Sequence, residues 1–221
     1  MISRRIAPVV GACVLLTGGI GASVLLGAGA AQATACLGTP LAAGTACTDL
    51  GTLTFTAGSL TFTPPTVYTW TATDTGVDQS VLAVGSGQEA ILVDDATGSG
   101  TGWNVTASST QFTATGPIYL PLTALSLNGS ATSATVAATP TAACSAATTC
   151  TLPTDSGVTY PVTAIETTPL KIYDAAAATG MGSIVLGLPG ANPMGWWVTI
   201  PANQKPGSYV STITLEVISA P

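Results

Sequence analysis

Residues 94–112 read DDATGSGTGWNVTASSTQF, and this stretch decides the fold. The glycines in GSGTG, at 98–102, permit the positive φ angles that tight turns need. After them Trp103, Val105 and Ala107 take alternate positions, which is the period of a half-buried β-strand. A phosphate-binding loop would end in Lys followed by Ser or Thr and lead into a helix, and this stretch does neither. It therefore predicts a turn that places Trp103 at the start of a strand.

The same period of two recurs along the chain from residue 51 onward. GTLTFT at 51–56 and SLTFT at 59–63 predict two adjacent strands of a hairpin, and Ile213, Leu215 and Val217 share one face of a C-terminal strand. Further strands are expected in VYTWTATD, QEAILVDD, IYLPLTALSL, VTYPVTAIE, PLKIYD, GSIVLGL and GWWVTIP. Nine or ten short strands separated by Gly, Pro, Asn and Asp turns predict an all-β fold, a single antiparallel β-sandwich of Ig-like or Greek-key type.

The N-terminal segment, residues 1–35, has the pattern of a cleaved signal peptide. Arg4 and Arg5 precede an apolar run, and small residues stand at the export positions from Ala31 to Ala35. The apolar run is also long enough to be a retained membrane-spanning helix, but its small-residue exit favours cleavage. Cleavage after Ala35 would make Cys36 the first residue, which leaves lipidation as a minority alternative, and cleavage after Ala33 is a further one. The chain is therefore expected to be secreted.

Four cysteines remain after the leader is removed, and an even number in an exported chain predicts two disulfides. They allow three pairings, of which the local one, Cys36–Cys47 and Cys144–Cys150, fits the spacing best. That pairing would staple the N-terminal segment 36–50. It would also cross-link the end of a Thr/Ala-rich segment, 129–151, which has no strand or helix periodicity and is predicted to be a surface loop.

Composition excludes several classes of function. The chain has no histidine, so Ser-His-Asp and Cys-His catalysis are impossible and a zinc site is not expected. The predicted mature chain keeps two lysines against ten acidic residues, and a net charge of −8 repels nucleic acid. Asp94 and Asp95 would point to opposite faces of a strand, a poor geometry for a glycosidase pair. We therefore expect a protein that is not an enzyme and needs no cofactor or metal.

The tryptophans are the most informative side chains. Trp70 is expected in the core, whereas Trp103, Trp196 and Trp197 each follow a glycine-containing turn and open a strand. Neighbours in a strand face opposite sides, so Trp196 and Trp197 cannot both lie in the core. One of them is therefore expected at the surface or in an interface, where an exposed aromatic patch indicates binding.

Two regions resemble the WxL family of bacterial surface proteins, and the resemblance spans about residues 51–221. DDATGSGTGWNVTASSTQF is similar to the family's Asp-x-x-Gly…Gly-Trp-x-Leu segment, with Val105 at the Leu position. The ending VTIPANQKPGSYVSTITLEVISAP is similar to the family's closing strands, with Tyr209 at the Tyr position and Leu215 where the second Trp would stand. The chain is thus identified as a divergent member, and its Ala- and Gly-rich, Lys-poor composition is typical of actinobacteria.

The resemblance implies an exported protein that attaches non-covalently to the bacterial cell wall, with peptidoglycan as its ligand. The expected binding residues are Trp103, Val105, Trp196, Trp197, Tyr209, Leu215 and Val217. A structural or adhesive subunit that binds itself or another exported protein is the alternative, and an exposed tryptophan would serve that role too. A carboxylate-based glycosidase is a third possibility, which would require two acids in one groove.

Overall fold

The computed structural model describes most of the chain after the leader. The described residues are 34–35, 40, 43, 47–48, 51–83, 90–146, 149–154, 157–188 and 192–219. Residues 1–33 of the predicted signal peptide and Cys36 of the predicted Cys36–Cys47 bond therefore lie outside the described residues. No helix in the described ranges is long and apolar enough to cross a membrane.

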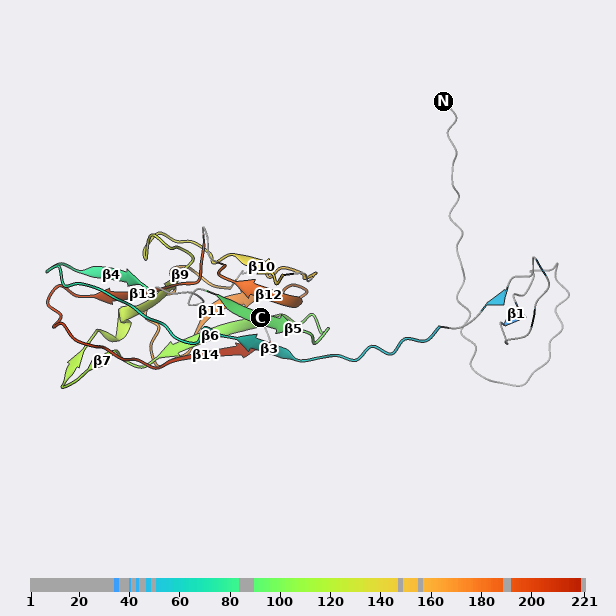
Figure 1. The fold of residues 1–221 in the computed structure, drawn as a ribbon, viewed down its shortest axis with the longest axis horizontal. Coiled ribbons are helices and arrows are strands. Elements are labelled where there is room, and N and C mark those ends of the chain that lie inside the picture. The colour runs from blue at the N-terminus through green and yellow to red at the C-terminus, as the bar shows by residue number, and fades with distance from the viewer. Residues whose placement is uncertain are drawn as a thin grey trace, which may run out of the picture. The chain divides into compact units, whose positions relative to one another are not determined.

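Residues Phe55–Pro221 form one compact unit made of strands (Figure 1). Its strands are β3 (Leu60–Thr63), β4 (Gln79–Leu82), β5 (Ile91–Asp95), β6 (Trp103–Ser109), β7 (Thr113–Ala114), β8 (Ile118–Tyr119), β9 (Leu125–Asn128), β10 (Ala142–Cys144), β11 (Leu170–Ala175), β12 (Gly182–Leu186), β13 (Gly195–Ile200) and β14 (Ile213–Ile218). A 3-10 turn, η1 (Leu122–Ala124), is the one helical element among the described residues. In the other unit, Met1–Thr54, β1 (Thr34–Ala35) pairs in parallel with β2 (Cys47–Thr48).

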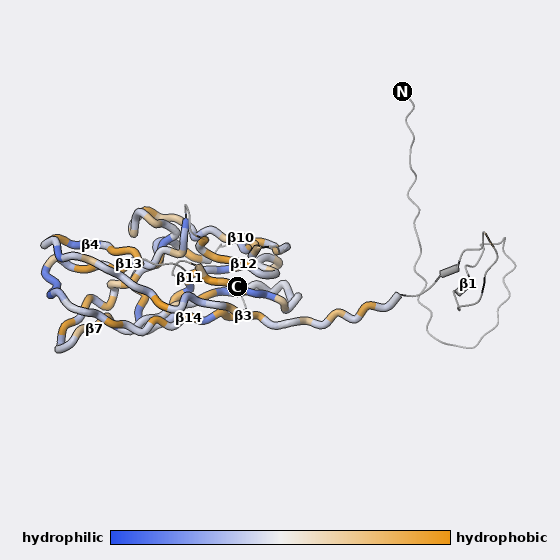
Figure 2. The backbone as a smooth tube through the Cα atoms, viewed as in Figure 1, coloured by the Kyte–Doolittle hydropathy of each residue, from blue (hydrophilic) through white to orange (hydrophobic). Residues whose placement is uncertain are grey.

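The predicted all-β fold is confirmed. Within the compact unit every ladder is antiparallel, in sheets of order β10-β12-β5-β3, β11-β6-β14 and β4-β13-β9, with a small β7–β8 hairpin. One apolar core gathers buried side chains from all three larger sheets. Figure 2 colours the backbone by hydropathy; apolar and polar residues alternate along β3 (LTFT) and β14 (ITLEVI), as expected for strands with one face inside.

The GSGTG stretch forms the predicted turn, and β6 begins at Trp103. Gly98, Gly100 and Gly102 all have positive φ, between 63° and 82°. The Trp103 side chain is completely buried, and its indole N–H donates to the Gly180 carbonyl at 2.8 Å. Since β6 lies between β11 and β14, this tryptophan fixes the start of the middle strand of its sheet.

The two leading carboxylates end β5, which is an inner strand of its sheet. Asp95 is buried, and its Oδ1 accepts hydrogen bonds from the Thr97 amide at 3.0 Å and the Thr97 hydroxyl at 2.7 Å. The carboxylate therefore shapes the first residues of the turn, as an Asp side chain can do by bonding two residues ahead.

The hairpin predicted from GTLTFT and SLTFT is wrong. SLTFT supplies β3, which pairs with β5, whereas residues 51–56 are extended without a partner strand. Leu53 and Phe55 are consequently 87% exposed. Two other segments expected as strands, 67–74 and 158–166, also form no ladder, and the second contributes only an isolated bridge from Val162 to Leu127.

The expectation that either Trp196 or Trp197 is exposed is also wrong, because both are buried, at 0% and 6% exposure. The two side chains do diverge as neighbours in a strand must, and only Trp196 belongs to the apolar core. Trp197 lies under the chain at Ser130, whose carbonyl accepts its indole N–H at 3.2 Å. The predicted surface loop thus covers the second face of β13.

The predicted Cys144–Cys150 disulfide is confirmed, with 5.5 Å between the two Cα atoms. It links the end of β10 to Cys150, which packs partly buried against the core. The next residue, Thr151, forms a bridge with Met181 beside β12. The bond therefore fixes the last part of the Thr/Ala-rich loop to the sheet.

Gly102→Ala should strongly destabilise the protein, by about 3 kcal/mol or more in urea unfolding. Its Cβ would lie 2.2 Å from the Ala175 carbonyl oxygen, and its φ is +82°. Gly98→Ala is the matched control, because its φ is +65° but no atom lies within 4 Å of the added Cβ. We expect the control to lose only about 1 kcal/mol. Equal losses in the two variants would contradict this account of the turn.

Candidate ligand-binding groove

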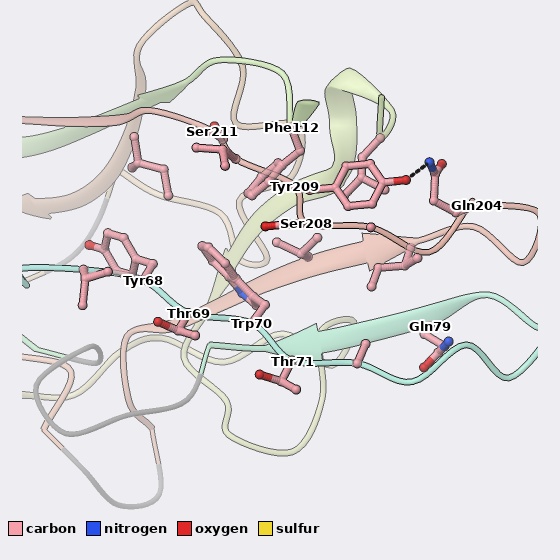
Figure 3. Close-up of a pocket in the computed structure, with 18 of the residues that line it drawn as sticks. Tyr68, Thr69, Trp70, Thr71, Gln79, Phe112, Gln204, Ser208, Tyr209 and Ser211 are labelled. Carbon is pink, nitrogen blue, oxygen red and sulfur yellow. Dashed lines mark hydrogen bonds between the residues drawn. The ribbon is translucent and has the colours of Figure 1, made fainter. Parts of the chain in front are cut away.

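An open groove of about 850 Å³ runs along the compact unit. Segment 64–72 forms one wall and segment 204–211 forms the other, as Figure 3 shows. Phe112, Val198 and Leu215 contribute from the strands and turns between them. Both walls are loops held on a rigid sheet, which is the usual placement of a binding site.

The first wall joins no ladder, and it begins with Pro64 and Pro65, which lack the N–H groups that ladder pairing uses. Aromatic packing holds it instead. The Trp70 indole N–H donates to the Trp196 carbonyl at 3.0 Å. The Tyr68 ring lies 4.9 Å from the Trp196 ring and 6.0 Å from the Trp70 ring, measured between centroids.

Trp70, which is expected in the core, is half-buried: it packs against the core and also lines the groove. Its ring meets Phe112 edge-on, with 5.6 Å between centroids. Because the indole N–H is hydrogen-bonded to Trp196 and the ring packs against Phe112, the orientation of the indole is fixed before any ligand binds. A fixed aromatic surface binds with little loss of conformational entropy.

The second wall is held by Tyr209. Its hydroxyl donates to the Lys205 carbonyl at 2.6 Å and accepts a hydrogen bond from the Gln204 side-chain amide, which Figure 3 marks. These bonds close the loop of residues 204–209, which contains Pro206 and Gly207, over only six positions. Tyr209 therefore positions this wall as well as facing the groove.

The groove carries little charge. Among the described residues that line it, Asp74 and Lys205 are the only ionisable ones other than tyrosines, and Asp74 already accepts a hydrogen bond from the Gly76 amide at 2.9 Å. Burial raises the pKa of Tyr68 well above its usual range, so its phenol keeps its proton even in alkaline solution where an exposed tyrosine would ionise. Hydroxyls and amides, such as those of Thr69, Thr71 and Gln79, supply the remaining polarity. The surface suits a ligand that is neutral, hydroxylated and partly apolar.

The structure brings two of the expected binding residues to this groove, Tyr209 and Leu215. Val217 lies half-buried on β14 and does not line it. The remaining four, Trp103, Val105, Trp196 and Trp197, are buried side chains that hold the sheets together. A direct role of the seven residues in binding stays a prediction.

Sequence reasoning missed the groove residues of the first wall, above all Trp70 and Val67. The signal was present in PPTVYTWTA, where an alternating aromatic pattern directly follows two prolines. Prolines before an alternating pattern argue against a central strand, so the aromatic side chains of this segment could have been expected on a loop packed outside a sheet.

Among the described residues, no group of three or more Cys, Asp or Glu side chains lies close enough to hold a metal ion.

A family model described as "WxL domain surface cell wall-binding" matches residues 50–221. That match covers most of the chain and includes both groove walls. No curated protein and no solved structure matches the chain.

Tyr68→Phe should stabilise the protein by about 1 kcal/mol, because it removes a buried hydroxyl that has no hydrogen-bond partner among the described residues. The variant should also alter the pH dependence. In the unfolded chain Tyr68 loses its proton near pH 10, whereas the folded chain keeps it, so wild-type stability falls as pH rises above about 10.

This loss is at most about 1.4 kcal/mol per pH unit from Tyr68, and it should be absent in the variant. Urea unfolding at pH 8 and again above pH 10 measures both effects. A Phe variant that is less stable than wild type at pH 8 would show that the hydroxyl does have a partner.

Proposed function

Since the chain belongs to the WxL domain family of cell wall-binding surface proteins, we propose that it binds peptidoglycan non-covalently through the groove between segments 64–72 and 204–211. The family places the protein outside the cell, at the wall. The observation that carries the proposal is the preset indole of Trp70, half-buried in an almost uncharged groove.

The chemistry of the groove favours the sugar part of the wall over its anionic polymers. Sugar rings present apolar C–H faces to an aromatic side chain, and hydroxyls to polar groups at its edge. The groove offers Trp70 and Tyr209 for the first kind of contact, and hydroxyl and amide side chains for the second. The ten acidic residues of the chain would repel a polymer rich in phosphate.

We infer that the protein acts by binding and not by catalysis. Glycoside hydrolysis of the usual kind uses two carboxyl groups about 5–10 Å apart. In the described part of the chain Asp74 is the only carboxylate that lines the groove, and its Oδ1 accepts a hydrogen bond from the Gly76 amide in the local turn. A binding role needs no second acid, which makes it the simpler use of these residues.

Val67→Glu should weaken binding to purified peptidoglycan about tenfold, equal to about 1.4 kcal/mol. Val67 lines the groove and is 57% exposed, so the substitution adds bulk and charge without disturbing the core. Val136→Glu is the matched control, because Val136 is 67% exposed and does not line the groove. Co-sedimentation of the exported protein with peptidoglycan gives the affinity.

Trp70→Ala is the second variant for this measurement, with its melting temperature recorded to show that it folds. It should lose at least as much binding as Val67→Glu. If both groove variants sediment like wild type, peptidoglycan does not bind in this groove. If wild type itself fails to sediment, the choice of peptidoglycan as ligand is refuted.

Binding should change less than about twofold between about 50 mM and about 500 mM salt, because salt screens charge interactions but not aromatic stacking or neutral hydrogen bonds. The same co-sedimentation, repeated along a salt series, checks this. A rise in affinity with salt would point to an anionic polymer held against repulsion. A steep fall would point to an ion pair through Lys205.

A further inference from the structure

The chain contains one hexapeptide almost twice in succession. Residues 51–56 read GTLTFT and residues 58–63 read GSLTFT, so the two differ only at Thr52 and Ser59. Position for position, the first copy lies seven residues before the second. The structure uses the two copies in completely different ways.

The second copy forms β3 at the edge of a sheet. Its Leu60 and Phe62 pack against the core, and Phe62 lies opposite Val93 in the ladder with β5. The pairing continues beyond the strand, since the Gly58 amide donates to the Ala96 carbonyl at 2.8 Å and the Ala96 amide donates to Ser59 at 3.2 Å. The whole hexapeptide therefore occupies one strand position along β5.

This position requires glycine at its first residue. A Cβ at Gly58 would lie 2.7 Å from the Ala96 Cβ, closer than real Cβ atoms approach. The first copy has glycine at the equivalent place, Gly51, although a Cβ there would meet no atom within 4 Å. Gly51 is therefore not needed where it lies, whereas a glycine would be needed if residues 51–56 occupied the β3 position.

The first copy also carries the apolar side chains of the position without using them. Leu53 and Phe55 correspond to Leu60 and Phe62, and both are 87% exposed. Exposed Leu and Phe at alternate positions cost free energy that burial on a sheet face would recover. Every side chain that the β3 position needs is therefore present twice.

We propose that residues 51–56 and 58–63 are alternative occupants of the same strand position along β5, exchanged by a slip of seven residues within one chain. The alternation is preserved because each Leu, Thr and Phe of one copy replaces the same residue of the other. A second molecule could supply the strand too, but a segment of the same chain is present at higher effective concentration.

The slip changes the groove. In the observed register four residues, 64–67, connect the strand position to Tyr68, and in the slipped register eleven residues, 57–67, would do so. Loop-closure cost grows only slowly with length, which keeps the second register within reach. The longer connection frees the wall that carries Trp70, so a ligand that needs this wall in place favours the observed register.

Substitution of the apolar pairs tests whether the first copy can take over. Leu53→Ser with Phe55→Ser should leave the melting temperature unchanged, because both side chains are exposed. Leu60→Ser with Phe62→Ser should lower it only modestly, and adding Leu53→Ser and Phe55→Ser should lower it by a further 5 °C or so. If the last two substitutions change nothing in the Leu60/Phe62 variant, the first copy does not enter the position and the proposal fails.

Cysteine trapping identifies the slipped register directly. Thr61 lies opposite Asp94, so Thr54 would lie there after the slip. In the full exported chain with Cys36 and Cys47 replaced by Ser, slow oxidation of Thr54→Cys with Asp94→Cys should yield a disulfide within one chain. The Leu60→Ser and Phe62→Ser substitutions should increase its yield severalfold.

Thr61→Cys with Asp94→Cys is the positive control for the observed register. Thr56→Cys with Asp94→Cys controls for chance encounters, because Thr56 would lie opposite Leu92. A Thr54 pair that links no more than the Thr56 pair overturns the proposal. A Thr54 link found only between two chains also overturns it and indicates strand exchange between molecules.

Discussion

The fold depends on how Trp103 is enclosed. Its indole is buried at the start of β6, donates to the Gly180 carbonyl, and stacks on Tyr173 with 6.3 Å between ring centroids. Gly102 and Gly180 leave no room for side chains, since a Cβ at Gly180 would lie 2.7 Å from the indole nitrogen. Because β6 carries β11 on one side and β14 on the other, this one residue sets the register of a whole sheet. The Gly-Trp element of the family motif therefore has a structural role, because it anchors the first residue of β6 in the core.

Binding capacity lies elsewhere, on segments that the sheets support but do not include. Segment 64–72, which begins with two prolines, joins no ladder, and aromatic contacts with Trp196 hold it in place. The hydroxyl of Tyr209 closes the opposite wall. The groove between them is nearly uncharged although the chain as a whole is acidic. The buried Trp103 turn thus supports the fold, whereas the side chains fixed on the groove walls form the surface that a ligand can reach.

The edge of the β10-β12-β5-β3 sheet links these two parts. β3 ends directly before the prolines of the first wall, so whatever holds β3 also limits how far Trp70 can move. Edge strands are the least constrained members of a sheet, and in this chain the sequence supplies two matching segments for one edge position. The length of chain available to the groove wall therefore depends on which segment pairs with β5, so the position of the wall is coupled to the pairing of the edge strand.

The sequence alone determined the strand period, the glycine turn before Trp103, the local Cys144–Cys150 bond and the family, because these depend on short-range patterns. It also ruled out histidine chemistry. The tertiary structure decided which aromatic side chains a ligand can reach. Alternation in GWWVTI assigns Trp196 and Trp197 to opposite faces, but only the fold shows that the chain at Ser130, 67 residues away, covers the second face. For the same reason, identical LTFT segments at 53–56 and 60–63 could not be told apart: burial depends on which one finds β5, and pairing with a distant strand is not written in a local pattern.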